Sequence, residues 1–364
     1  MLPRLQSPSA RLALGVLALV VAVDILWLWQ SPITFEWASC KRPVKTAGIA
    51  LAASAASAAI LRWLSGDHTR PARILQAITR GLANLGCLVA YMAVFTAAAA
   101  VLSYLAATVA WPLQDALLAR TDRAMGFDWL PFLAWFNARP TIGLALSEAY
   151  HSSMNQVMAL LVILSFLNRP KDAWDFAGLF AVTLTVVLAI SAVLPASGAY
   201  VFYAPDPALY ANLNADAGRW HYLDFLALRA GTFTGLSLDR LQGLVTFPSF
   251  HTVLAIITTY ALRNLRLLFW PALLLNAAVI LSTLTEGGHF LIDLPAGAVI
   301  ACLAISLIRR ISPERVADAR PMLEWRPTPD QTQPEGPVSA LVWPFRVSPH
   351  PRRHRGHRIQ NLAR

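Results

Sequence analysis

The chain has 364 residues, of which 56% are hydrophobic and only 14% are charged, and its formal net charge at pH 7 is +10. A soluble protein of this length is rarely so apolar, and long uncharged runs are typical of membrane spans. The composition therefore argues against a soluble globular protein. The positive charge does not indicate nucleic-acid binding, because eleven arginines lie in the last stretch of the chain, from Arg309 to Arg364.

Apolar segments recur along the chain at lengths that suit membrane-spanning helices. They cover residues 11–29, 45–63, 83–110, 144–167, 175–195, 250–263, 267–284 and 290–309. The segment 250–263 is short for a span of about 20 residues, so we expect its neighbours to complete the crossing. The expected fold class is all-α: a polytopic integral membrane helical bundle with about eight transmembrane helices and long outer loops.

Three regions follow one another in the sequence. Residues 1–110 hold the N-terminal transmembrane helices, 111–310 form a second membrane domain, and 311–364 are rich in arginine and proline. The last composition cannot bury much apolar surface, so it predicts a disordered cytoplasmic tail. The first segment, Leu12 to Trp29, is long for a signal peptide and lacks a small-residue cleavage site, which favours an uncleaved span.

The distribution of Lys and Arg predicts the orientation. With a cytoplasmic N-terminus and alternating spans, the short inner loops carry a higher density of positive charge than the long outer loops. The cluster Lys41, Arg42 and Lys45 is the exception. We therefore expect a protein of the bacterial inner (plasma) membrane, with cytoplasmic N- and C-termini and with 111–143 and 196–248 as long loops on the periplasmic or outer face. The apolar spacing in 111–143 predicts an amphipathic surface helix.

The segment Thr246–His251 places a serine and a histidine at the start of an apolar run. Ser249 is expected to cap a helix there, and the free N–H groups of a helix start suit a bound phosphate. His251 would then stand beside that anion and protonate a leaving oxygen. The alternative for this segment alone is a capped helix with an interfacial histidine.

A second histidine follows two glycines in Gly287-Gly288-His289, and Asp293 comes four residues after it. That spacing puts both side chains on one face of a helix, where a carboxylate fixes the imidazole tautomer. His289 is therefore a candidate nucleophile held by Asp293, and Gly288 permits close approach of a ligand or of backbone. The alternative is a His–Asp pair that stabilises a helix end.

Together the two segments resemble the type-2 phosphatidic acid phosphatase superfamily of integral-membrane lipid phosphatases and phosphotransferases. The second motif of that family, Pro-Ser-x-His, is matched at Pro248 to His251, and its third motif ends in His-x-x-x-Asp, matched at His289 to Asp293. The resemblance implies that His289 is the nucleophile, Asp293 its orienting carboxylate and His251 the general acid. It implies no metal and no cofactor, and it makes 111–310 the phosphatase/phosphotransferase-like domain.

The sequence departs from that family at two phosphate-binding cations. No Arg-Pro pair is preceded at seven residues by Lys, and Ser282-Thr283 stands where Ser-Arg is usual. The chain in this respect resembles the branch containing the fungal inositol phosphorylceramide synthases, as do Asp122–Trp129 and Ala149–Ser153.

Other residues could take the place of the two missing phosphate-binding cations, and only their position in the chain points to them. Arg240 and Arg123 lie in the outer segments and are candidates to bind a phosphate through paired donors, although ordinary interfacial arginines are the alternative. Tyr150 lies near an outer span end and either lines the site or only packs at the interface.

The expected function is a metal-independent phosphotransferase, inositolphosphotransferase-like, that acts on membrane lipid phosphate or phosphodiester headgroups through a phosphohistidine intermediate. The acceptor would be a hydroxyl-bearing lipid or water. One alternative is a lipid phosphate phosphatase of the phosphatidic acid or polyprenyl phosphate type. A further alternative is a non-catalytic lipid-binding or transport protein.

Overall fold

A computed structural model describes residues 7–313 of the chain, so the expected tail from residue 314 onward lies outside the described residues. The expected all-α class is confirmed, because the elements within residues 7–313 are helices apart from two strands of two residues each. The longer helices are α1 (Pro8–Gln30), α2 (Lys41–Trp63), α3 (Arg70–Ala107), α6 (Pro140–Phe166), α7 (Pro170–Val193), α10 (Phe250–Ala261), α11 (Arg266–Thr285) and α12 (Asp293–Ile311).

Short elements fill the connections between these helices. They are the helices α4 (Asp115–Ala124), α5 (Trp129–Asn137), α8 (Ala199–Tyr203) and α9 (Tyr222–Arg229), the 3-10 turns η1 (Trp37–Cys40), η2 (Leu64–Gly66) and η3 (Pro207–Leu209), and the strands β1 (Thr34–Phe35) and β2 (Gly235–Leu236). The strands pair in parallel, with Thr34 opposite Gly235. The pair fastens the α1–α2 connection to the loop that precedes α10.

Six helices of the described part are long and apolar enough to cross a membrane: α1, η1–α2–η2 taken together, α3, α7, α11 and α12. The expected count of about eight spans is therefore not confirmed. The two remaining expected segments differ for separate reasons. Helix α6 has 27 residues but carries polar side chains such as Glu148 and Gln156, whereas α10 has only 12 residues.

Local sequence signals explain where several helices begin. Thr69 caps α3 by accepting from the N–H of Ala72, and Pro71 follows at a position where the missing N–H costs nothing. Proline also opens α6 and α7. Ser249 caps α10 by accepting from the N–H of Thr252, which confirms the expected helix start.

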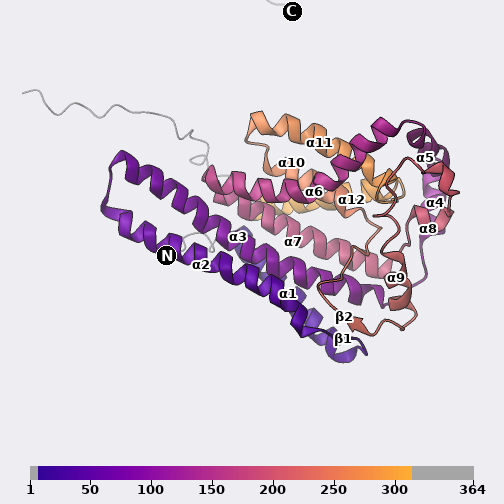
Figure 1. Ribbon diagram of the computed structural model, residues 1–364, viewed down its shortest axis with the longest axis horizontal. Coiled ribbons are helices and arrows are strands. Elements are labelled where there is room, and N and C mark those ends of the chain that lie inside the picture. The colour runs from indigo at the N-terminus through magenta and orange to yellow at the C-terminus, as the bar shows by residue number, and fades with distance from the viewer. Residues whose placement is uncertain (1–6, 314–364) are drawn as a thin grey trace, which may run out of the picture. The chain divides into compact units, whose positions relative to one another are not determined.

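The main core is a single cluster of buried apolar side chains from α1, α3, α6, α7, α10 and α12. Its fully buried members include Phe95 on α3, Phe176 on α7 and Val253 on α10. Helix α2 packs along α3, and α11 packs on α6 and α10 (Figure 1). The N-terminal helices therefore share one core with the later ones.

The short elements α4, α5, α8 and α9 and the strands gather at one end of the long helices (Figure 1). A second apolar cluster joins α4, α5 and α8 to Phe290 in the α11–α12 connection. The buried carboxylate of Asp115 accepts from the backbone N–H groups of Ser197 and Gly198 at 2.9–3.0 Å, which ties the two long loops together. This end of the bundle is where the expected site residues lie.

Candidate active site

His289 lies in the short connection between α11 and α12 and is only 3% exposed. Its Nδ1 is 2.9 Å from Oδ2 of Asp293, the first residue of α12. The expected pairing is confirmed, although His289 precedes the helix instead of lying one turn along it. Oδ2 of Asp293 also accepts from the N–H of Phe290 at 3.0 Å, so one carboxylate oxygen fixes both the ring and the backbone that carries it.

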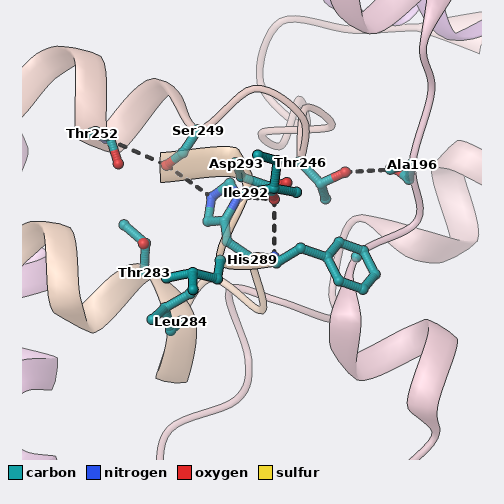
Figure 2. Close-up of polar contacts among 12 residues, drawn as sticks. Ala196, Thr246, Ser249, Thr252, Thr283, Leu284, His289, Ile292 and Asp293 are labelled. Carbon is teal, nitrogen blue, oxygen red and sulfur yellow. Dashed lines mark hydrogen bonds and ion pairs between the residues drawn. The ribbon is translucent and has the colours of Figure 1, made fainter. Parts of the chain in front are cut away.

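The start of α10 meets the start of α12 directly. The backbone N–H of Ser249 donates to the carbonyl of Asp293 at 3.2 Å, and its Oγ lies 3.4 Å from Nε2 of His289. Figure 2 shows the resulting arrangement, with the Ser249 hydroxyl between the imidazole and the first turn of α10. The two motifs are 40 residues apart at Ser249 and His289 but share one site.

His251 lies in the first turn of α10 and is half-buried. Its ring stacks on Tyr150 of α6, with ring centroids 4.3 Å apart and planes inclined by 26°. The stacking limits rotation of the imidazole about its χ angles. Tyr150 is thus more than interfacial packing, since it orients His251 and also lines the cavity described next.

A cavity of 360 Å³ separates the two histidines from the outer loops. Most of its lining comes from the loop between α8 and α10, including His221 and Thr246, while α10 contributes His251 and the α11–α12 connection contributes Gly287 and His289. None of the lining residues, taken within residues 7–313, is a lysine or an arginine.

Burial controls the charge of His289. It lowers the pKa of this imidazole to about 4, while the nearby backbone of Thr246 opposes the shift. At neutral pH the ring is therefore uncharged. With the proton on Nδ1 directed to Asp293, Nε2 presents a lone pair toward Ser249 and the cavity. A neutral, oriented imidazole of this kind can act as a nucleophile.

A second carboxylate holds the connection that carries His289, from the side of α4. Asp122 of α4 is 1% exposed, and its two oxygens accept from the N–H groups of Leu291 and Ile292 at 2.7 and 2.9 Å. These are free donors just before α12, so Asp122 caps that helix from another element. The indole of Trp129 donates to the carbonyl of Leu284 at 3.1 Å on the other side of the connection.

The structure places the remaining expected binding residues differently. Gly288 has a φ of +62° and its carbonyl accepts from the N–H of Ala199 at 2.7 Å, so backbone of another loop approaches it closely. Its neighbour Gly287, and not Gly288, lines the cavity. Arg240 and Arg123 are exposed and are not among the lining residues. Their roles in phosphate binding stay predictions.

Sequence reasoning gave no site role to three buried polar residues near the site: His221, Asp122 and Glu286. Burial raises the pKa of Glu286 to about 7, against the opposing effect of the nearby Ser147 side chain. His221 and Asp122 belong to loops and helices distant in sequence from both motifs. The signals in the sequence were the place of Asp122 in the segment Asp122–Trp129 and the adjacency of Glu286 to Gly287.

Comparison with known proteins gives one family match. A family model described as the PAP2 superfamily matches residues 116–307, which is more than half of the chain and includes both histidine motifs. No curated protein and no solved structure matches the chain. Among residues 7–313 no group of three or more His, Cys, Asp or Glu side chains could hold a metal ion.

Proposed function

The chain belongs to the PAP2 superfamily, and from this membership we propose that it is a membrane phosphotransferase that uses His289 as its nucleophile. Members of the superfamily are generally phosphatases or phosphotransferases that act on lipid phosphates. The observation that carries the proposal is the buried, uncharged His289, paired at 2.9 Å with Asp293 and sharing one cavity with His251.

The proposed first step forms a phosphohistidine. Burial lowers the pKa of His251, but the approach of a phosphate anion favours the protonated ring, so His251 takes up a proton as the substrate binds. The lone pair on Nε2 of His289 then attacks phosphorus, the bond from phosphorus to the leaving oxygen breaks, and His251 gives its proton to that oxygen. Asp293 accepts the Nδ1–H of His289 and stabilises the positive charge that develops on the ring. In the second step His251 takes the proton of an attacking hydroxyl, whose oxygen bonds to phosphorus as the N–P bond breaks.

The hydroxyl that resolves the intermediate decides the reaction class. We propose an inositolphosphotransferase-like reaction with a hydroxyl-bearing acceptor, because Thr283 occupies the position of a usual family arginine and is fully buried, with its hydroxyl bonded to the carbonyl of Ile280. If water takes the same position, the protein is a lipid phosphate phosphatase. A non-catalytic lipid-binding protein would keep the cavity but release no product.

We also propose that the site faces the outer side of a bacterial inner membrane, with both termini in the cytoplasm. The support is the charge at the opposite end of the helices. Basic residues cluster at the connections there: Arg62, Arg70, Arg73, Arg169, Lys171, Arg263, Arg266, Arg309 and Arg310. These connections are short, so their density of positive charge is higher than that of the long loops at the other end, as is typical of cytoplasmic loops.

Trapping of the intermediate tests the nucleophile. Purified full-length protein in detergent is mixed with phosphatidic acid carrying ³²P, and the acid-labile label is located by peptide mapping. We expect wild type to label at His289 and His289→Gln to show no label and at least about a 10²-fold loss of turnover. His68→Gln, at an exposed histidine on the opposite end, serves as the matched control and should behave as wild type.

The lipids made by cells that express wild type or His289→Gln then identify the reaction. A lipid with a new phosphorylated headgroup, present only with wild type, supports the transferase. Loss of a lipid phosphate with no such product supports the phosphatase. Turnover by His289→Gln at the wild-type rate would exclude the proposed nucleophile.

A further inference from the structure

A third histidine enters the cavity from the outer loop. His221 immediately precedes α9, is 3% exposed and lines the same cavity as His251 and His289. Within the described part of the chain neither of its ring nitrogens has a hydrogen-bond partner. The backbones of Ser197 and Ala217 are near enough to favour the charged ring, but neither meets hydrogen-bond geometry. A buried imidazole without partners costs free energy, so it calls for a ligand or a functional reason.

The position of His221 is fixed by close backbone packing, not left to a free loop. A Cβ at Gly218 would come within 2.7 Å of the Tyr200 ring and 3.1 Å of the backbone of Gly287 and Gly288. Only a glycine therefore permits this contact between the outer loop and the nucleophile's connection. The N–H of Trp220 donates to the carbonyl of Asp216 at 2.9 Å, closing the turn that immediately precedes His221.

The chain on the far side of His221 is also anchored. Asp224 in the first turn of α9 accepts from the hydroxyl of Tyr104 at 2.8 Å, which joins α9 to the end of α3. The same Tyr104 oxygen accepts from the N–H of Gln242, another cavity residue. His221 is thus held from both sides on elements that pack against the bundle.

A phosphoryl group in this cavity needs donors for its non-bridging oxygens, because charge on these oxygens must be stabilised in the transition state. The lining offers no lysine or arginine for that purpose within residues 7–313. His289 is occupied by the attack on phosphorus and His251 by the leaving oxygen. We propose that His221 is a phosphate-binding residue, whose ring N–H donates to a non-bridging oxygen of the phosphoryl group being transferred.

This assignment rests on the proposed function and gives the cavity its missing donor. Burial lowers the pKa of His221, so the ring is neutral in the empty cavity, where it lies beside His289. A neutral imidazole still carries one N–H. An arriving phosphate would favour the protonated ring, since a nearby opposite charge stabilises the charged form. Phosphate binding and proton uptake by His221 would then accompany each other.

Two substitutions separate a phosphate donor from a residue that only fills space. His221→Gln keeps a side-chain N–H at similar reach, whereas His221→Leu keeps the volume and removes every donor. The measurements are the inhibition constant of inorganic orthovanadate, and KM and kcat for phosphatidic acid, with the full-length protein in detergent. A hydrogen bond to a charged group is worth about 1.5–3 kcal/mol, so we expect a rise of about 10- to 100-fold in KM and in the orthovanadate constant for His221→Leu. His221→Gln should stay within about 5-fold of wild type, an expectation derived from the retained donor.

A second measurement tests His221 independently of the proposed nucleophile. Calorimetry measures the binding of inorganic phosphate to the His289→Gln protein and to double variants that also carry a substitution at His221. If the added His221→Leu abolishes phosphate binding and the added His221→Gln preserves it, His221 is supported as a hydrogen-bond donor to phosphate. This conclusion holds even if wild type never labels at His289. The assignment of His221 is overturned if wild type labels at His289 while His221→Leu leaves KM and the affinities for orthovanadate and inorganic phosphate unchanged. If His221→Leu does not fold, His221→Met replaces it under the same expectations.

Discussion

At the scale of single residues, burial determines the chemistry of the site. His289 is uncharged because desolvation penalises the imidazolium, and Asp293 fixes which nitrogen carries the proton. Asp293 is completely buried, and its second oxygen has no hydrogen-bond partner in the described part of the chain. Such a carboxylate is costly to keep and is retained where it orients another group.

The lowered pKa of His289 predicts a stability difference with a definite sign. Between pH 6.5 and about 4 the unfolded chain binds a proton at this position that the folded chain does not bind. The stabilisation is complete above pH 6.5 and is lost as the pH falls toward 4. Wild type should therefore lose on the order of 2 kcal/mol more of its unfolding free energy between pH 7.5 and 4.5 than His289→Gln, which cannot protonate there.

Thermal unfolding in detergent across this pH range measures the difference. His68→Gln removes an exposed histidine and should follow the wild-type curve. His221 and His251 are present in all three proteins, so only the part of their pKa shifts that His289 causes differs between wild type and His289→Gln. Parallel curves for wild type and His289→Gln would mean that His289 is not held neutral by burial.

At the scale of elements, α4 positions the α11–α12 connection although it contributes nothing to the cavity lining. The amphipathic pattern of this region predicted a surface helix with an apolar face. The structure instead buries two carboxylates on that face, Asp115 and Asp122, together with Leu118 and Ala119. Each carboxylate accepts from backbone N–H groups of a different connection, so α4 acts as a clamp between them.

The substitution Asp122→Asn tests this clamp. Asparagine offers one acceptor and turns its amide donors toward a backbone N–H, so one of Leu291 and Ile292 loses its partner. We expect a loss of about 1–3 kcal/mol in unfolding free energy, which is the usual cost of an unsatisfied buried donor. The rate of phosphoenzyme formation should fall as well, because His289 lies two residues before Leu291. Unfolding midpoints and labelling rates of the purified variant measure both effects.

Asp239→Asn provides the matched control for Asp122→Asn. Its carboxylate pairs with Arg42 at 3.5 Å, but the arginine side chain is 85% exposed, and such surface pairs contribute little. We expect wild-type stability and labelling. If Asp122→Asn also kept the wild-type unfolding midpoint and labelling rate, α4 would not be needed to hold the backbone of the α11–α12 connection.

At the scale of the whole described unit, charge and topology place the two ends of the bundle in different environments. The active-site end carries aromatic loops, while ion pairs fasten the opposite end. Lys171 contacts Asp175 at 2.7 Å and the carbonyl of Ser312 at 2.9 Å, and Arg263 lies 3.5 Å from Asp172. The asymmetry supports the proposed orientation, with the basic end in the cytoplasm.

Two exposed tryptophans allow a matched test of this orientation. Trp220 at the active-site end is 66% exposed and Trp63 at the opposite end is 79% exposed. With Cys40, Cys87 and Cys302 replaced by alanine, a membrane-impermeant maleimide should label Trp220→Cys but not Trp63→Cys in intact cells. Both variants should label after permeabilisation. The reverse pattern in intact cells would invert the proposed topology.

The sequence by itself determined the helical membrane class, the capped start of α10, the His289–Asp293 pair and the family. Each depends on residues close together in the chain: apolar runs of span length, Ser249 before an apolar helix, and a histidine four residues before an aspartate. The family expectation is confirmed by the match over residues 116–307. The branch resembling inositol phosphorylceramide synthase stays a proposal, and the count of eight spans was not confirmed because α6 is too polar by composition and α10 too short.

Only the tertiary structure decided which loop residues enter the site. Asp122 and Tyr150 lie more than a hundred residues from the groups they hold, and neither spacing nor composition records such contacts. His221 was hidden for the same reason, since a lone histidine in a long loop carries no periodic signal. Its place depends on Gly218 packing against Gly287 and Gly288, a contact between backbones that becomes visible only when the chain is folded.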